Sequence, residues 1–173
     1  QEQKANNINL VTGGHYIPQI VRALDLVRGK LHIPVVYNSS GYETVEALRM
    51  LKGYVDVYLP DLKYRSPERG ARYSHAPDYF AVASKAILEM FDQVGPVRFD
   101  GQGMIQKGLI VRHMVMPNGV EDSMDILTWI AGNLPLDDIL VSVMSQYTPF
   151  YRSGEYPEID RRLTAREYDR VLD

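Results

Sequence analysis

Short apolar runs alternate along the chain with longer stretches in which apolar residues recur every three or four positions. The first pattern indicates a strand buried in a sheet, and the second indicates a helix that packs one side against that sheet. Repeated strand–helix alternation is typical of parallel strands joined by crossover helices. We therefore expect an α/β fold whose strands lie at residues 8–12, 33–38, 55–63, 109–116 and 139–146.

The intervening segments predict helices and irregular regions. The expected helices begin near residues 17, 45, 78, 121 and 164, with an irregular or helical segment from residue 66. Residues 96–107 are rich in glycine and are expected to form a loop, and residues 148–161 are expected to form a surface excursion. Thr164 and Glu167 have the Thr-x-x-Glu spacing of a capping box, which predicts the start of the last helix.

The third predicted strand begins apolar and ends charged. Alternation places Val55, Val57, Leu59, Asp61 and Lys63 on one face. In a parallel β/α barrel such a face is core at one end and active site at the carboxyl end. For a single strand, the more ordinary interpretation is that its end simply emerges into water. The other predicted strands, however, also end in polar or glycine-rich segments, at residues 12–15, 38–41, 112–113 and 145–147. Together these ends predict a site at the carboxyl edge of the sheet.

Composition limits the classes of function. The chain has 173 residues, of which 45% are hydrophobic and 24% are charged, so we expect a single globular domain over residues 1–173. The net charge is -3 and the Lys and Arg residues are scattered, which favours neither a nucleic acid nor a membrane as partner. Without a long apolar run or a signal-peptide pattern, the expected location is cytoplasmic.

The residue content also limits the metal chemistry of the chain. It contains no cysteine, which excludes disulfides, thiolate metal sites and a cysteine nucleophile from these residues. The four histidines are dispersed, so we expect no metal ligands here. The chain does not begin with Met, and residues 1–5 resemble the end of a helix, so we expect a piece of a longer protein.

Four segments in this order resemble the strand-end motifs of radical S-adenosylmethionine (SAM) enzymes, and within them of proteins similar to pyruvate formate-lyase activating enzyme. They are NINLVTGGHYIPQ at residues 7–19, VYNSSGY at 36–42, YLPDLKY at 58–64 and VRHMVMPNG at 111–119. The resemblance covers essentially the whole chain. It implies a partial (β/α)6 TIM-like barrel in which the predicted strands are the second to the sixth, with the first strand and cluster loop missing.

The resemblance implies that the end of the first predicted strand contacts SAM. Thr12, Gly13 and Gly14 look like the family's Gly-Gly-Glu motif, which holds the amino group of SAM, but His15 stands where the family has Glu. A neutral imidazole accepts one hydrogen bond from an ammonium group and supplies no counter-charge. A glycine turn before a helix is the other interpretation of this segment.

The next two strand ends supply further expected SAM contacts. Asn38 matches a polar position that lines the SAM pocket, although turn formation before Gly41 also accounts for it. Asp61 and Lys63 look like the family's Asp-x-Lys pair. The resemblance implies that Lys63 binds a carboxylate of SAM or substrate and that Asp61 orients Lys63.

The last two strands complete the set of expected cofactor-binding residues. Arg112 matches a family arginine that binds the SAM carboxylate or ribose hydroxyls, and a buried ion pair is the alternative. His113 alternates to the other face and is expected to be structural. Gln146 stands where the family places adenine contacts.

The family's chemistry requires three cysteines that hold a [4Fe-4S] cluster, at which SAM is reductively cleaved to a 5′-deoxyadenosyl radical. We expect these ligands upstream of residue 1, so that this chain alone is inactive while its parent is a radical SAM enzyme. The resemblance implies a glycyl radical enzyme as protein substrate and an electron donor such as flavodoxin or ferredoxin.

Two other interpretations compete with the enzyme. A degenerate barrel without the cluster, which binds a nucleotide or peptide, is favoured modestly by His15. An α/β hydrolase or a phosphate-binding barrel would require Gly-x-Ser-x-Gly or Walker spacing, and the chain has neither.

Overall fold

The computed structural model describes residues 5–173, which form a mixed α/β fold around one mostly parallel sheet. The strands are β1 (Ile8–Val11), β2 (Val35–Ser39), β3 (Val57–Pro60), β4 (Arg98–Phe99), β5 (Ile105–Met114) and β6 (Leu140–Met144). Strands β1, β2, β3, β5 and β6 are parallel neighbours in that order, and short β4 runs antiparallel to the start of β5. Among the described residues the sheet does not close on itself.

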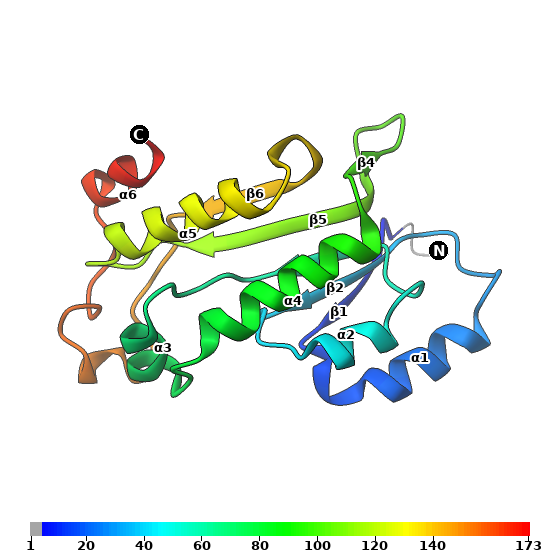
Figure 1. The fold of residues 1–173 in the computed structure, drawn as a ribbon, viewed down its shortest axis with the longest axis horizontal. Coiled ribbons are helices and arrows are strands. Elements are labelled where there is room, and N and C mark those ends of the chain that lie inside the picture. Colours follow the sequence, from blue (N-terminus) through cyan, green and yellow to red (C-terminus); the bar gives the residue numbers. More distant parts are fainter. Residues whose placement is uncertain (1–4) are drawn as a thin grey trace.

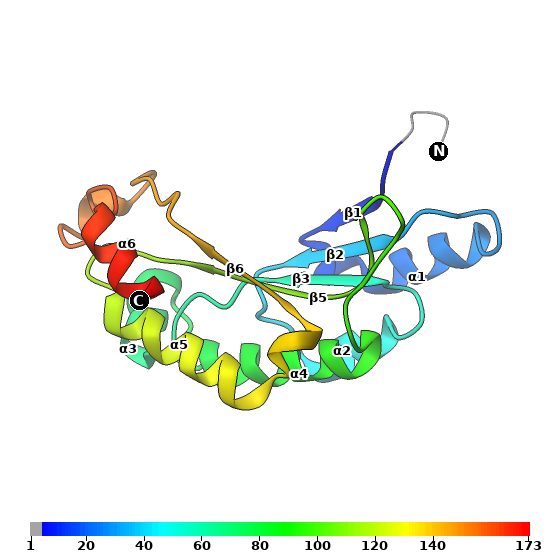
Figure 2. The same ribbon diagram turned by 90° about the horizontal axis from the view of Figure 1, so that it is seen from above.

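Six main helices accompany this sheet within residues 5–173. They are α1 (Ile17–Leu26), α2 (Val45–Met50), α3 (Pro67–Ser74), α4 (Tyr79–Val94), α5 (Val120–Asn133) and α6 (Ala165–Leu172), with short 3-10 turns at Gly13–Tyr16, Leu136–Asp138 and Ser153–Glu155. Figure 1 shows α4 and α5 running along β3 and β5. In Figure 2 helices α2 to α5 lie together below the sheet, and the opposite side carries none of them.

The hydrophobic core lies between the sheet and these helices. Tyr37 of β2, Tyr58 of β3 and Leu109 of β5 are fully buried there, against Ile87 and Met90 of α4. Alternation sends the intervening strand residues to the other, helix-free face. That face therefore carries the side chains available for a site.

Strand register sets which side chains meet on the helix-free face. Asn38 pairs with Leu59 between β2 and β3. Asp61 forms an isolated parallel bridge with Arg112 of β5. Because these residues share one face near the carboxyl ends of three strands, the register brings their side chains together.

All five predicted strands are present, although the third is confined to Val57–Pro60 and the fifth ends at Met144. The capping box is confirmed, since Thr164 accepts from the Glu167 amide and the Glu167 carboxylate accepts from the Thr164 amide.

Residues 1–4 lie outside the described residues, and Ala5 belongs to no helix. Over residues 5–173, no helix is both long enough and apolar enough to span a membrane.

The prediction of a loop over residues 96–107 is wrong in part, because this segment forms β4 and the start of β5. Asp100 closes the connection by accepting from the amides of Gln102 and Met104. Gly108 has φ +133°, and an added Cβ there would lie 2.7 Å from the Val97 Cα. Gly103 of the expected loop, with φ +78°, thus lies in a tight antiparallel turn, and Gly108 just after it permits a close backbone approach.

Candidate functional site

Four predicted site residues form one polar cluster at the carboxyl edge of the sheet. Asp61 Oδ1 lies 2.7 Å from Arg112 Nη2, and Asp61 Oδ2 lies 3.7 Å from Lys63 Nζ. Arg112 Nη2 also donates to Asn38 Oδ1 at 2.8 Å. We call Asn38, Asp61, Lys63 and Arg112 the strand-end cluster.

Charge and burial in the strand-end cluster favour an anionic group as its partner. The Asp61 and Arg112 side chains are 22% and 26% exposed, and Lys63 is 40% exposed. Two cations face one carboxylate, so the cluster carries one surplus positive charge. Arg112 Nε is buried and has no hydrogen-bond partner within residues 5–173. A buried unpaired donor is unfavourable, which makes this atom a candidate contact for an acceptor.

Backbone hydrogen bonds fix the segment that carries Asp61 and Lys63. The Asp61 amide donates to the Ser39 carbonyl at 3.0 Å, and the Leu62 amide donates to the Arg112 carbonyl at 2.8 Å. The chain beyond β3 is therefore held by both neighbouring strands.

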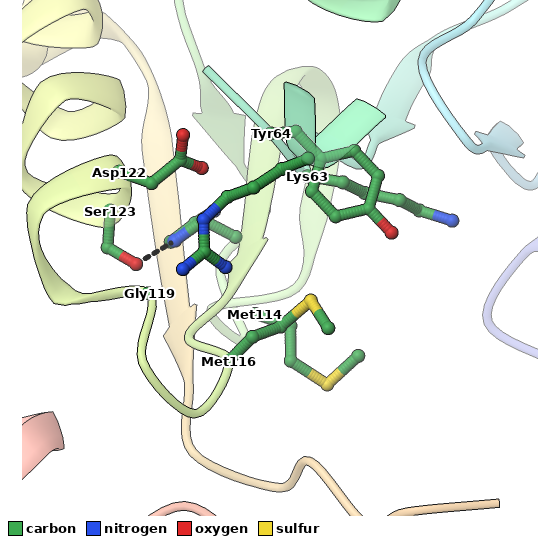
Figure 3. A pocket seen from close by; sticks show the side chains of 9 residues that line it. Lys63, Tyr64, Met114, Met116, Gly119, Asp122 and Ser123 are labelled. Carbon is green, nitrogen blue, oxygen red and sulfur yellow. Dashed lines mark hydrogen bonds between the residues drawn. The ribbon is translucent and has the colours of Figure 1, made fainter. Parts of the chain in front are cut away.

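His113 supports the same segment from the helix-covered face. Its Nδ1 lies 2.7 Å from the Leu62 carbonyl oxygen and its Nε2 lies 2.8 Å from Ser123 Oγ. Burial lowers the pKa of His113, which keeps the imidazole neutral, so Nδ1–H donates to Leu62 and Nε2 accepts from Ser123. Figure 3 marks the Ser123 bond and shows Lys63 and Tyr64 bordering the same small pocket. This geometry agrees with the structural role expected for His113.

The Thr12–Gly14 segment forms a tight turn next to Asn38, whose carbonyl oxygen accepts from the Thr12 amide at 2.9 Å. The segment takes no part in the side-chain bonds that join the strand-end cluster in residues 5–173. Thr12 has φ +54° and starts the 3-10 turn Gly13–Tyr16. Gly13 packs so closely on Tyr37 that an added Cβ would lie 3.2 Å from its ring. His15 is exposed. The turn therefore requires small residues, which fits the glycine-turn interpretation and leaves its predicted SAM contact a hypothesis.

Glu43 brings a carboxylate to this turn and was absent from the predicted site. An added Cβ on Gly14 would lie 2.9 Å from Glu43 Oε2, and the Tyr37 hydroxyl donates to Glu43 Oε1 at 3.2 Å. Burial raises the pKa of Glu43. The only sequence signal for it was its place just after the strand-end segment 38–41, and its approach to Gly14 depends on tertiary packing.

Gln146 forms no hydrogen bond with the other predicted residues in the part of the chain that the structure describes. It is exposed, lies beyond the end of β6, and takes no part in the hydrogen bonds that join the strand-end cluster in residues 5–173. The neighbouring Tyr147 donates its hydroxyl to the Ile159 carbonyl at 3.0 Å. The adenine contact expected for Gln146 stays a prediction.

An open, largely aromatic pocket of about 200 Å³ lies next to the ends of β3, β5 and β6. Its lining includes Tyr64, Tyr73, Met116, Tyr147, Phe150 and Tyr156. Within residues 5–173 no group of three or more His, Cys, Asp or Glu side chains is arranged to hold a metal ion. What the described residues offer is thus a cationic cluster with an aromatic pocket nearby.

Comparison with known proteins finds one clear relative. The chain is 37% identical over 171 residues to an uncharacterized protein of Methanocaldococcus jannaschii, a match that covers 98% of this chain and 46% of the relative. The chain thus spans about half the length of that relative. No family model matches the chain, and no solved structure matches it. The relative carries no assigned activity, so the geometry of the site has to supply the functional argument.

Proposed function

We propose that the chain forms most of a partial β/α barrel of radical SAM type, and that the strand-end cluster binds the amino-acid part of SAM. The observation that carries this proposal is the meeting of Asn38, Asp61, Lys63 and Arg112, from three adjacent parallel strands, on the helix-free face. Ligands of open parallel sheets and of β/α barrels bind at this edge.

The chemistry of the cluster fits SAM group by group. The surplus positive charge suits the SAM carboxylate, and the 3.7 Å separation of Lys63 from Asp61 leaves Lys63 able to turn to it. Asp61 can accept from an ammonium or a ribose hydroxyl while it keeps its 2.7 Å contact with Arg112. The unpaired Arg112 Nε offers one more donor.

The iron–sulfur cluster of the proposed enzyme has no ligand in this chain, which contains no cysteine. Its cysteines therefore belong, in this proposal, to other parts of the protein, and the relative is long enough to hold them, since this chain matches only 46% of it. When bound, that cluster supplies the electron for reductive cleavage of SAM, which yields the hydrogen-abstracting 5′-deoxyadenosyl radical. The residues of this chain would bind and orient the amino-acid end of SAM and line the approach of the substrate.

A glycyl radical enzyme as substrate, and flavodoxin or ferredoxin as electron donor, remain part of the proposal. The aromatic pocket next to the strand ends is open to solvent and has room for a substrate group.

The test uses the full-length protein that contains this chain. After anaerobic iron–sulfur reconstitution, we expect SAM binding and formation of 5′-deoxyadenosine with a reductant. Lys63→Met should weaken SAM binding roughly ten- to hundredfold, because it removes a charge-assisted hydrogen bond. Lys52→Met is the matched control, since Lys52 is exposed in the turn between α2 and β3, at the opposite edge of the sheet.

Two outcomes would contradict the proposal in different ways. A reconstituted protein that neither binds SAM nor forms 5′-deoxyadenosine would remove it. Binding of SAM or a nucleotide by a protein that takes up no iron would instead support the degenerate barrel without the cluster.

A further inference from the structure

We infer that Tyr79, at the start of α4, is a positioning residue that sets where Asp61 and Lys63 stand in the strand-end cluster. The inference rests on the proposed function for its link to SAM. Its structural part rests on three contacts of one buried hydroxyl group.

The Tyr79 hydroxyl joins the segments that follow β2 and β3. It lies 2.7 Å from the Ser40 carbonyl oxygen and 3.0 Å from the Asp61 carbonyl oxygen, and it accepts from the Lys63 amide at 3.0 Å. The residue is only 3% exposed. One hydroxyl group thus ties the backbone on both sides of Leu62 to the end of the neighbouring strand.

The close approach of the two segments depends on a glycine as well as on Tyr79. Gly41 has φ +78°, and an added Cβ would overlap the Asp61 carbonyl oxygen and lie 3.5 Å from the Tyr79 hydroxyl. The absence of a side chain at residue 41 therefore lets the backbone after β2 reach the same carbonyl that Tyr79 contacts.

The hydroxyl stays protonated and held in place. Burial raises the pKa of Tyr79 far above its usual range, so the hydroxyl group is protonated at neutral pH and can donate. Its ring packs between two others, stacked on Tyr42 at 6.0 Å between centroids and edge-on to Tyr64 at 5.5 Å. Removing the hydroxyl alone would leave this ring packing intact.

Positioning matters here because Lys63 has a long side chain and, within residues 5–173, a single ion-pair partner at 3.7 Å. Neither that partner nor solvent fixes its ammonium group closely. Its backbone anchor, held by Tyr79, therefore sets how far the ammonium reaches over the helix-free face. Ligand-binding groups need support of this kind, since small displacements cost much of their effect.

The experiment compares Tyr79→Phe with Tyr58→Phe in the full-length protein. Tyr58 is the matched control because it is also buried, lies on β3 itself, and loses one hydroxyl bond, to Gln93 Oε1 at 2.7 Å. The first measurement is hydrogen exchange of the Lys63 amide, which needs no ligand. We expect it to quicken about tenfold in Tyr79→Phe and to stay unchanged in Tyr58→Phe.

The second measurement is SAM binding by the reconstituted protein. We expect the dissociation constant to rise about tenfold in Tyr79→Phe and to stay near the native value in Tyr58→Phe. A general loss of stability would affect both variants, so this contrast separates positioning from folding. Faster exchange with unchanged SAM affinity, in a native protein that binds SAM, would overturn the inference, as would unchanged exchange.

A native protein that fails to bind SAM would refute the proposed function but would still allow the role of Tyr79 to be tested. In that case, the rate at which acetic anhydride modifies the Lys63 amine is measured in place of the SAM dissociation constant. We expect this rate to change in Tyr79→Phe but not in Tyr58→Phe. Equal rates in all three proteins would overturn the positioning role of Tyr79.

Discussion

Asp61 and Arg112 face each other across the junction of β3 and β5, joined by a backbone bridge and by a 2.7 Å contact between Oδ1 and Nη2. The same carboxylate lies 3.7 Å from Lys63. Asp61 therefore balances both cations of the strand-end cluster, and the electrostatics of the site depend on this one side chain.

Asp61→Asn should lower the free energy of unfolding of the protein. Without the carboxylate, Arg112 and Lys63 repel each other in a half-buried position, and we expect a loss of about 1–2 kcal/mol in the free energy of unfolding. Chemical denaturation of the full-length protein measures this free energy. Glu155→Gln, which breaks the exposed Arg152–Glu155 pair, is the control and should stay within about 0.5 kcal/mol of the native protein. Equal losses in both variants would contradict the special role of Asp61.

Gly41→Ala should destabilise the protein more than Gly53→Ala. Both glycines have positive φ, +78° and +82°, so both variants carry the backbone strain of about 1 kcal/mol. Only at residue 41 does the new Cβ overlap a backbone oxygen, whereas Gly53 has nothing within 4 Å. We expect an extra loss of about 1–3 kcal/mol at residue 41. Thermal and urea unfolding would measure the difference, and equal losses would show that the segments after β2 and β3 are not in contact.

Stability should fall as the pH drops below about 6.5, the ordinary pKa of histidine. Burial lowers the pKa of His113 in the folded protein, so between the folded and unfolded pKa values the unfolded chain binds more protons. Stability is therefore full above the unfolded pKa and is lost as the pH falls toward the folded one. Melting temperature measured from pH 8 to pH 5 should show this decline.

His113→Gln should be less stable at pH 8 yet show a shallower decline below pH 6.5, because the titrating group is gone. His32→Gln is the control, since His32 is exposed. A decline as steep in His113→Gln as in the native protein would assign the pH dependence to other groups.

Thr164→Ala should cost about 1 kcal/mol of stability, because it removes the side-chain acceptor at the start of α6. Thr128→Ala, at an exposed interior position of α5, should leave stability unchanged or raise it slightly. Urea denaturation measures the free energy of unfolding of both variants. A Thr164→Ala variant as stable as the native protein would mean that α6 contributes little to global folding.

Most residues of the strand-end cluster could be predicted from the sequence, because the alternation of side chains along a strand depends only on local sequence. The face defined by Leu59, Asp61 and Lys63 follows from side-chain direction alone, and parallel order then brings Asn38 and Arg112 to the same edge.

What could not be read from the sequence depends on packing between distant segments. Tyr79 begins a helix and reaches the Lys63 amide from 16 positions along the chain, which no periodicity encodes. The start of β5 was likewise hidden, because Gln106 and Lys107 are polar and follow a glycine-rich turn, and only pairing with β4 reveals them as strand.

The contact between Gly41 and Asp61 also offers a criterion for recognising other chains with this site. Any homologue that closes the two segments in the same way must have no Cβ at the position of Gly41, so glycine is required there. In this chain that glycine ends an Asn-x-x-Gly element that precedes Pro-Asp-x-Lys, and the combination can serve as a search pattern. Genome sequences can be screened for that combination, and those that keep the acidic and basic residues but have a bulkier residue at the glycine should fold this edge differently.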